Sequence, residues 1–158
     1  MRVRVGQGFD VHPFVDDPER PLVLGGVVHP SDRALAGHSD ADVIAHACAD
    51  ALLGAAGLGD IGQLFPDTDP AWAGADSIGL LAEVARRVRA EGWEPGNVDA
   101  SVVTDHPKLA PAREEMQARL SAAVGAPVTV KGRRPEGLGA LGRGEGVACW
   151  AVAVVTAP

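Results

Sequence analysis

Several features that would place this chain in a common class are scarce or absent. It has two cysteines, Cys48 and Cys149, both in apolar stretches, so we expect buried thiols and no disulfide framework. No apolar run approaches the roughly 20 residues that a membrane span needs. The first ten residues, MRVRVGQGFD, lack the apolar segment of a signal peptide. We therefore expect a cytoplasmic protein.

Positive charge is also scarce. The 14 Lys and Arg residues stand against 21 Asp and Glu, which gives a net charge of −7. This balance argues against nucleic acid or an anionic membrane as the main partner. An anionic substrate would therefore have to be attracted by local cations.

Familiar catalytic motifs are missing as well. There is no Walker A sequence, no HExxH, and no nucleophilic Ser or Cys in a catalytic setting. Gly137–Gly142 matches G-x-G-x-x-G, but the string leads into a predicted strand and too little chain follows for a dinucleotide-binding unit. We therefore reject that interpretation.

The residues that are present predict one domain over residues 1–158. Hydrophobic residues make up 46% of the chain, enough to form a stable core without disulfide bonds or structural metal ions. Apolar periodicity and turn residues predict strands at 2–9, 22–24, 27–29, 97–104, 127–131 and 147–156, and helices at 40–56, 76–90 and 111–124. Residues 30–37, 58–74 and 132–146 are expected to be irregular. This order indicates an α+β fold, in which a mixed β-sheet carries its helices on one face.

Asp10, His12 and His46 form a candidate metal site. Asp10 and His12 end the first strand two residues apart, so their side chains point to the same face. A helix packed on that strand would bring His46 to the pair, and Asp plus two His is a typical zinc set. Asp42, one turn before His46, is a candidate to hold a ring nitrogen of a ligand histidine. From these residues alone a purely structural role stays open. His29 and His106 have no such partners and are expected to be structural or at the surface.

Three polar segments are candidate substrate contacts. His38 and Ser39 precede a helix start, where backbone N–H groups favour phosphate, although a plain loop is the alternative. The acidic loop 58–70 could accept hydrogen bonds from sugar or polyol hydroxyls, or it could be a solvated loop. The basic stretch 131–136, with Lys108, could bind phosphates and offer Glu136 to a hard cation. A solvated charge run is the alternative there.

Four motifs, in this order and spacing, resemble the 2-C-methyl-D-erythritol 2,4-cyclodiphosphate synthase family: GFDVH, AGHSDADVIAHACADALLGAAGLGDIG, LFPDTDP and GRGEG. The similarity extends from Val3 to Val155. It implies conversion of 4-diphosphocytidyl-2-C-methyl-D-erythritol 2-phosphate to the cyclic diphosphate, with release of CMP. It also implies a homotrimer whose sheets surround a three-fold axis with a channel, and whose active sites lie between subunits.

The resemblance also assigns residues. Asp10, His12 and His46 match the zinc ligands, and Glu136 matches the ligand of the Mg²⁺ or Mn²⁺ that arrives with the substrate. His38 and Arg134 fall on catalytic positions that stabilise the transition state. The remaining matches are substrate-binding positions: Val11, Ser39, Asp60, Ile61, Gly62, Phe65, Pro66, Asp67, Thr68, Asp69, Thr104, Asp105, His106, Pro107, Lys108, Leu109, Ala110, Arg133, Pro135 and Arg143.

This chain departs from the family pattern at two places. Arg133-Arg134-Pro135 stands where relatives commonly carry three threonines, and we expect Arg134 to bind the nucleotide phosphates as a charged donor. Ala140 replaces an aromatic residue often found beside the three-fold channel, which removes an aromatic wall for a prenyl diphosphate.

Two other functions fit the bare residues. One is a metal-dependent nucleotide diphosphate hydrolase, which would form linear phosphate products. The other is a non-catalytic trimeric module that binds metal and an isoprenoid without turnover. Neither explains the order of the motifs along the whole chain.

Overall fold

The computed structural model describes residues 1–158 and has a five-stranded sheet beside a small hairpin. The sheet order is β4-β1-β7-β5-β6, and β2-β3 form the hairpin. The strands are β1 (Arg2–Val15), β2 (Leu22–Leu24), β3 (Val27–His29), β4 (Ala34–Leu35), β5 (Glu94–Val103), β6 (Val128–Arg133) and β7 (Gly146–Ala157). The helices are α1 (Val43–Ala56), α2 (Ile61–Leu64), α3 (Ser77–Ala90), α4 (Arg113–Val124) and α5 (Gly139–Gly142), with 3₁₀ turns η1 (Pro70–Trp72) and η2 (Ala110–Ala112).

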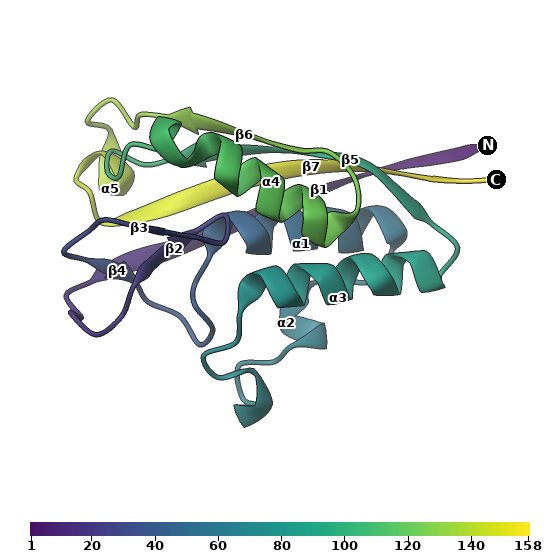
Figure 1. Ribbon diagram of the computed structural model, residues 1–158, viewed down its shortest axis with the longest axis horizontal. Helices are drawn as coiled ribbons and strands as arrows, with labels where there is room; N and C mark the ends of the chain where they lie inside the picture. Colours follow the sequence, from purple (N-terminus) through teal and green to yellow (C-terminus); the bar gives the residue numbers. More distant parts are fainter.

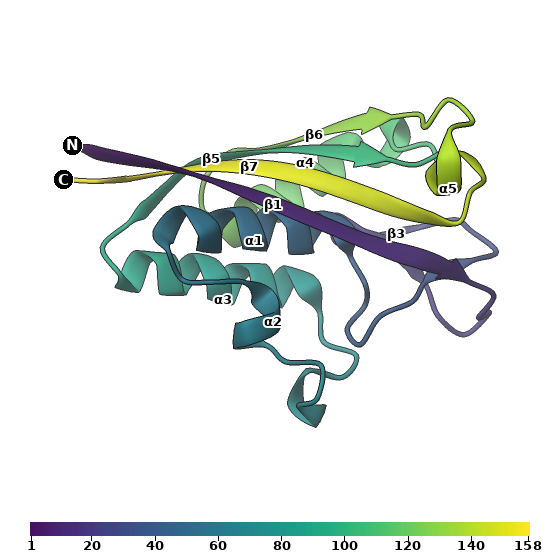
Figure 2. The ribbon, with the colours of Figure 1, turned by 180° about the vertical axis from the view of Figure 1, so that it is seen from behind.

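The predicted α+β class is confirmed. β5 and β6 pair in parallel and the other strand pairs are antiparallel, so the sheet is mixed. Helices α1, α3 and α4 lie on one side of it (Figures 1 and 2). The chain begins and ends side by side, because Arg2 on β1 is in register with Ala157 on β7 (Figure 1).

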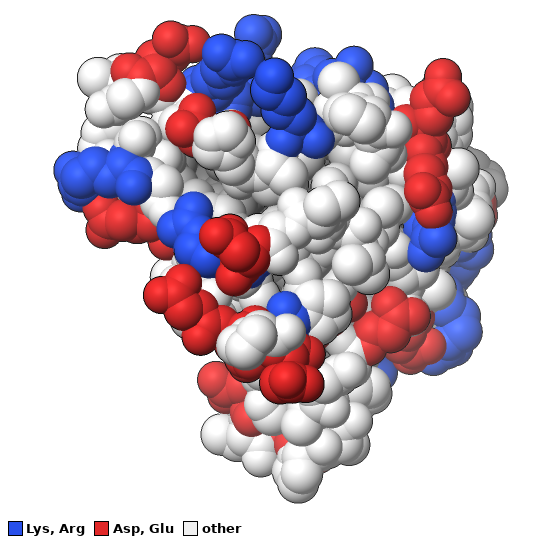
Figure 3. All heavy atoms as spheres, turned by 60° about the vertical axis from the view of Figure 1, so that its left-hand side comes forward, with Lys and Arg blue, Asp and Glu red and all other residues white.

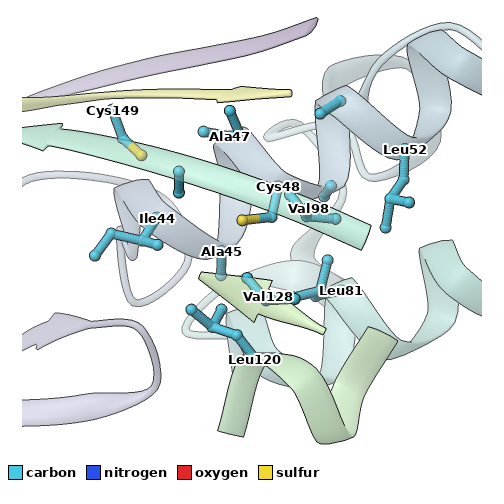
Figure 4. Close-up of a cluster of buried hydrophobic side chains, with 14 of the residues drawn as sticks. Ile44, Ala45, Ala47, Cys48, Leu52, Leu81, Val98, Leu120, Val128 and Cys149 are labelled. Atoms are coloured by element: carbon cyan, nitrogen blue, oxygen red, sulfur yellow. The ribbon is translucent and has the colours of Figure 1, made fainter. Parts of the chain in front are cut away.

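Helix α1 forms the centre of the core. Twelve of its fourteen residues are buried, which explains its weak amphipathic pattern in the sequence. Figure 4 shows Ile44, Cys48 and Leu52 of α1 among side chains from the sheet and from α3 and α4. Cys48 and Cys149 are free and buried, as predicted, and burial raises the pKa of both thiols.

Two glycines allow α1 to lie directly on β1. A β-carbon at Gly6 would be 2.0 Å from the carbonyl oxygen of Ala51, and one at Gly8 would be 1.9 Å from that of Ala47. Both distances are far below van der Waals contact with backbone that cannot rotate away. The closeness of helix and strand therefore depends on the absence of side chains at these two positions.

The element boundaries differ from the predictions in several places. Helix α1 begins after Asp42, not near Asp40, because Ala41 has φ +57° and cannot belong to the helix. The segment 30–37 contains β4, which pairs with the end of β1 and extends that strand to Val15. The loops 58–74 and 132–146 contain the one-turn helices α2, η1 and α5, too short for periodicity to reveal.

The hairpin and the helix ends follow their sequence signals. Gly25 and Gly26 have φ +61° and +74°, the values of a two-residue turn between β2 and β3. Gly57 ends α1 in the left-handed conformation, and Asp76 caps α3. No helix in the protein combines the length and the apolar character required to cross a bilayer.

Candidate metal centre and the adjoining clefts

Asp10 and His12 meet as the strand geometry predicts. Both project from the helix-covered face of β1, and Oδ2 of Asp10 lies 2.9 Å from Nε2 of His12. The other ring nitrogen of His12, Nδ1, lies 2.6 Å from the carbonyl oxygen of Ala36. A carbonyl only accepts hydrogen bonds, so Nδ1 carries the proton and Nε2 of a neutral ring has a free lone pair.

His46 reaches the same point from α1. Its Nδ1 lies 2.9 Å from Oδ2 of Asp10, and its ring centroid is 5.6 Å from that of His12. The approach follows from the contact of α1 with Gly6 and Gly8 on β1. The predicted meeting of a strand end and a distant helix is therefore confirmed.

The three side chains fit a divalent cation. One ligand atom from each of Asp10, His12 and His46 lies within 4.8 Å of the others. Nε2 of His12 is buried and makes no hydrogen bond despite its closeness to Asp10. Its lone pair is therefore without a partner and free to coordinate a metal ion. A carboxylate with two imidazoles suits zinc and related metals.

Electrostatics at the cluster favour a charged carboxylate. Burial raises the pKa of Asp10, but the two imidazoles outweigh it and bring that pKa below its ordinary value. Burial lowers the pKa of His12, and the Asp10 carboxylate reverses this and leaves it raised. The imidazoles of His12 and His46 therefore stabilise the ionised carboxylate of Asp10.

A cleft of about 500 Å³ opens beside the three side chains. We call it the metal-side cleft. Besides the three candidate ligands it is lined by Gly37, His38, Ser39, Ile61, Gly62, Phe65, Asp67, Trp72 and Leu80. Gly37, His38 and Ser39 come from the loop before α1, Leu80 comes from α3, and the others come from the segment between α1 and α3. Five predicted substrate-binding positions, Ser39, Ile61, Gly62, Phe65 and Asp67, and the predicted catalytic His38 therefore lie next to the candidate metal ligands.

A second, basic cleft of about 220 Å³ lies where β5 and β6 end. It is lined by Thr104, Asp105, Pro107, Lys108, Leu109, Ala110, Arg113, Gly132, Arg133 and Arg134. The ion pairs of the protein use other lysines and arginines, so the four cations here have no acidic partner. Figure 3 views the end of the molecule that is at the left in Figure 1, and Lys and Arg gather there at the top.

The two clefts occupy the same end of the sheet but share no residue. Asp10 on β1 is in register with Cys149 on β7, which in turn is in register with Val102 near the end of β5. A further hollow of about 430 Å³ shares Arg113, Gly132 and Arg133 with the basic cleft. Within it, Lys131 is paired with Asp99 at 2.5 Å.

The other predicted site residues line neither cleft in the single chain. Val11 is exposed on the face of the sheet without helices, and Arg143 pairs with Glu145 at 2.5 Å. Asp60 and Asp69 cap α2 and η1. Their carboxylates therefore already have backbone partners. The remainder are Pro66, Thr68, His106, Pro135 and Glu136.

The predicted role of Asp42 is wrong. Its carboxylate contacts no histidine; it accepts hydrogen bonds from the N–H groups of Gly25 and Gly26 and from Ile44 and Ala45 at the start of α1. Burial raises the pKa of this fully enclosed carboxyl. Asp42 therefore joins the hairpin to α1. His29 is buried near the carbonyl oxygen of Leu24 and is structural, as predicted.

Sequence reasoning missed three residues at these sites. Oγ of Ser77, the first residue of α3, lies 2.8 Å from Nε2 of His46. Trp72 lines the metal-side cleft and packs edge-on against Phe65, with ring centroids 4.8 Å apart. Arg113 begins α4, where a cation is disfavoured by the helix dipole. That unfavourable placement was the one signal in the sequence that could have indicated an anion site.

Fold and site together define an α+β protein with a candidate cation site beside one cleft and unpaired cations around another. The chain belongs to the YgbB family, whose profile matches residues 3–156. The 2-C-methyl-D-erythritol 2,4-cyclodiphosphate synthase of Azoarcus sp. (strain BH72) is 55% identical over 155 residues, 96% of this chain and 94% of that protein. The protein of the same name from Thermosynechococcus vestitus is 50% identical over 158 residues, 98% of this chain and 97% of that one.

Solved structures show the same fold. The CDP complex of IspF from Plasmodium falciparum superimposes with a TM-score of 0.83 at 32% identity, over 98% of this chain and 96% of that one. The bifunctional IspDF of Campylobacter jejuni gives a TM-score of 0.91 at 41% identity, over 98% of this chain but 42% of that longer chain. The family resemblance inferred from the motifs is confirmed.

Proposed function

We propose that this protein converts 4-diphosphocytidyl-2-C-methyl-D-erythritol 2-phosphate to 2-C-methyl-D-erythritol 2,4-cyclodiphosphate and CMP. The observation that carries the proposal is the convergence of Asp10, His12 and His46 on a cleft lined by the family's substrate positions. The names of relatives that are 50% and 55% identical over nearly the whole chain support it.

The reaction needs charge neutralisation and positioning more than a strong base. An oxygen of the 2-phosphate forms a bond to the β-phosphorus, the bond from that phosphorus to the bridging oxygen breaks, and the electron pair leaves with CMP. Nucleophile and electrophile belong to one molecule, so orientation supplies much of the acceleration. Both groups are anionic, so fixed donors and cations must offset their repulsion.

In the metal-side cleft, Asp10, His12 and His46 would hold zinc, one ion per chain. When bound, the metal supplies positive charge close to the phosphate oxygens. His38 and Ser39 present an imidazole and a hydroxyl to the same cleft as donors for a phosphate. Gly62 and Asp67 also line this cleft and provide contacts for the polyol hydroxyls.

In the basic cleft, the chain holds the cytidyl end of the substrate. Lys108, Arg133 and Arg134 offer unpaired charge to the diphosphate, and the backbone from Thr104 to Ala110 surrounds the base. The family member from Plasmodium falciparum was solved with CDP, a ligand of the same chemistry. Glu136, in a left-handed conformation at φ +53° beyond this cleft, is the residue we assign to Mg²⁺ or Mn²⁺ brought with the substrate.

The active unit is a homotrimer with active sites between subunits. The metal-side and basic clefts share no residue, so one substrate bridging them is best accommodated when each chain supplies one cleft to a neighbour. The face of the sheet without helices exposes a row of apolar side chains suited to burial by further copies: Val3, Val5, Phe9, Val11, Trp150 and Val152. On this face the rings of Phe9 and Trp150 already pack against each other at an angle of 49°, with centroids 4.9 Å apart.

We also propose that the chain acts as a single domain in the cytoplasm. The apolar core connects α1, α3, α4 and the sheet in one cluster of 37 residues, which supports one domain. Two free buried thiols fit a reducing compartment.

The proposal is tested by incubating the purified protein with the cytidyl substrate, zinc and Mg²⁺, and following phosphorus by NMR. We expect CMP and the cyclic diphosphate in equal amounts. Linear phosphate products would instead indicate a hydrolase. Binding of metal without any release of CMP would indicate a non-catalytic module.

A further inference from the structure

We propose that Ser77 and Asp40 form a positioning relay that fixes the ring of His46, so that its Nδ1 is the nitrogen presented to the metal. The inference deepens the proposed function, because it rests on the metal site assigned there. Neither residue is a candidate ligand, and neither contacts the cleft. Both act on the site through His46.

The relay is built from three elements that are distant in sequence. Nε2 of His46, on α1, lies 2.8 Å from Oγ of Ser77, the first residue of α3. Oγ of Ser77 in turn donates to Oδ1 of Asp40, in the loop before α1. The backbone N–H of Ser77 also donates to Oδ2 of the same carboxylate at 3.1 Å. Ser77 is only 1% exposed, so its hydroxyl is shielded from water.

The direction of the hydrogen bonds follows from their chemistry. An ionised carboxylate only accepts, so the hydroxyl proton of Ser77 points to Asp40. The Ser77 oxygen must then accept the proton on Nε2 of His46. With Nε2 protonated, Nδ1 of the neutral ring carries the lone pair, and Nδ1 is the atom 2.9 Å from Asp10. A carboxylate behind the hydroxyl also makes the imidazole a stronger electron donor.

The two candidate histidine ligands are therefore oriented in different ways. His12 is held at Nδ1 by a backbone carbonyl, that of Ala36, and presents Nε2. His46 is held at Nε2 by a side chain and presents Nδ1. A carbonyl cannot be removed by substitution, but a hydroxyl can. The hydrogen bond that orients His46 can therefore be tested directly by mutation, whereas the one that orients His12 cannot.

Ser39 is the competing support. Its Oγ lies 3.2 Å from Nε2 of His46, longer than the 2.8 Å contact of Ser77, and 3.4 Å from the Ser77 hydroxyl. Ser39 also accepts the N–H of Ala41 and faces the metal-side cleft, where the proposed function uses it for phosphate. Ser77 has no such second task. We therefore assign the permanent support to Ser77 and Asp40.

The test is a zinc titration of metal-free protein against a chelating dye, a readout independent of turnover. We expect Ser77→Ala to raise the zinc dissociation constant about 10- to 100-fold. Asp40→Asn keeps the shape of the side chain but removes the charge, and we expect a smaller increase in the same direction. Ser77→Thr retains the hydroxyl and should restore binding to near the wild-type value.

The matched control is Asp76→Ala, at the neighbouring position. Asp76 caps α3 through the N–H of Ile78 and does not touch His46, so its loss should lower the melting temperature while zinc affinity is unchanged. Equal losses of affinity in Asp76→Ala and Ser77→Ala would mean that both act by loosening α3, which would overturn the relay.

The outcomes separate this inference from the proposed function. If wild-type protein binds no zinc, the metal site itself is wrong. If wild-type and folded Ser77→Ala bind zinc equally well, only the relay is wrong. Should Ser77→Ala fail to fold by circular dichroism, Asp40→Asn decides, and an unchanged dissociation constant in that variant refutes the proposal.

Discussion

Gly8 on β1 and Ala47 on α1 are packed backbone against backbone, so that a β-carbon on Gly8 would lie 1.9 Å from the carbonyl oxygen of Ala47. Asp10 follows Gly8 by two residues, and His46 immediately precedes Ala47. The distance between the candidate ligands Asp10 and His46 is thus set by the adjacent contact of Gly8 with Ala47, which is possible because glycine has no side chain.

The first prediction concerns this contact. Gly8→Ala should displace α1 from β1, destabilise the fold by about 1–3 kcal/mol as an overpacked core does, and weaken zinc binding. Urea unfolding and the zinc titration measure the two effects. Gly54→Ala is the matched control: it lies in the interior of α1, and its new β-carbon would be 3.6 Å from the nearest atom. That change should stabilise the helix by about 0.5–1 kcal/mol. A folded Gly8→Ala protein with normal stability and zinc affinity would contradict the argument.

Removal of one ligand should empty the metal site. We expect wild-type protein dialysed with zinc to retain one ion per chain by elemental analysis, and His46→Ala to retain none and to release no CMP. His106→Ala provides the control for zinc content. That histidine is exposed, and its side chain pairs only with the exposed Asp105, at 3.8 Å. Full turnover by His46→Ala without zinc would refute the metal assignment.

The bare face of the sheet predicts the assembly. Trp150→Glu places a charge among the exposed apolar side chains of β1 and β7, and it should convert a trimer to monomers in light scattering after gel filtration. Val28→Glu is the comparison, because Val28 is also exposed, at 64%, but lies on the hairpin strand β3. A trimer that survives Trp150→Glu, or that Val28→Glu dissociates equally, would place the interface elsewhere.

Arg134 should contribute to nucleotide binding. Arg134→Ala removes one unpaired cation from the basic cleft, and loss of a charged hydrogen bond of about 1.5–3 kcal/mol predicts a fall in kcat/KM of about 10- to 150-fold. Arg86→Ala, at an exposed arginine on α3 that pairs with Glu83, should leave the kinetics unchanged. Unaltered kcat and KM in Arg134→Ala would show that this arginine does not take over the role of the threonine that relatives commonly carry at its position.

The stability of α3 should depend on pH through Glu83. Hydrogen bonds from Arg86 and Arg87 lower the pKa of Glu83 from 4.5 to about 2. A depressed pKa in the folded state means that the stabilisation is complete above the ordinary pKa and disappears as the pH falls toward 2. The pairs are at the surface, so Glu83→Gln should cost only about 0.2–1 kcal/mol at pH 7. In urea titrations the difference from wild type should shrink below pH 4.5; a difference that is constant with pH would contradict this origin.

Local sequence signals were sufficient for most of the elements. Gly25-Gly26, Gly57 and Asp76 act at short range, and each performs the turn or cap that its residue type favours. The pairing of Asp10 with His12 also follows from strand geometry alone. Boundaries failed where a longer-range interaction competes. β4 exists only because β1 offers it a pairing edge, and α1 starts late because Ala41 is held in a left-handed turn.

The residue types of the chain therefore specified its strands, its main helices and, with the family motifs, the side chains of the candidate metal site. Tertiary structure decided which groups support those side chains. Asp42 has the right helical spacing to hold His46, yet its carboxylate serves the hairpin, and Ser77 from another helix holds the ring instead. Spacing along a chain limits only which neighbours are within reach. The direction of each hydrogen bond is settled when packing brings distant donors and acceptors together and excludes water from them.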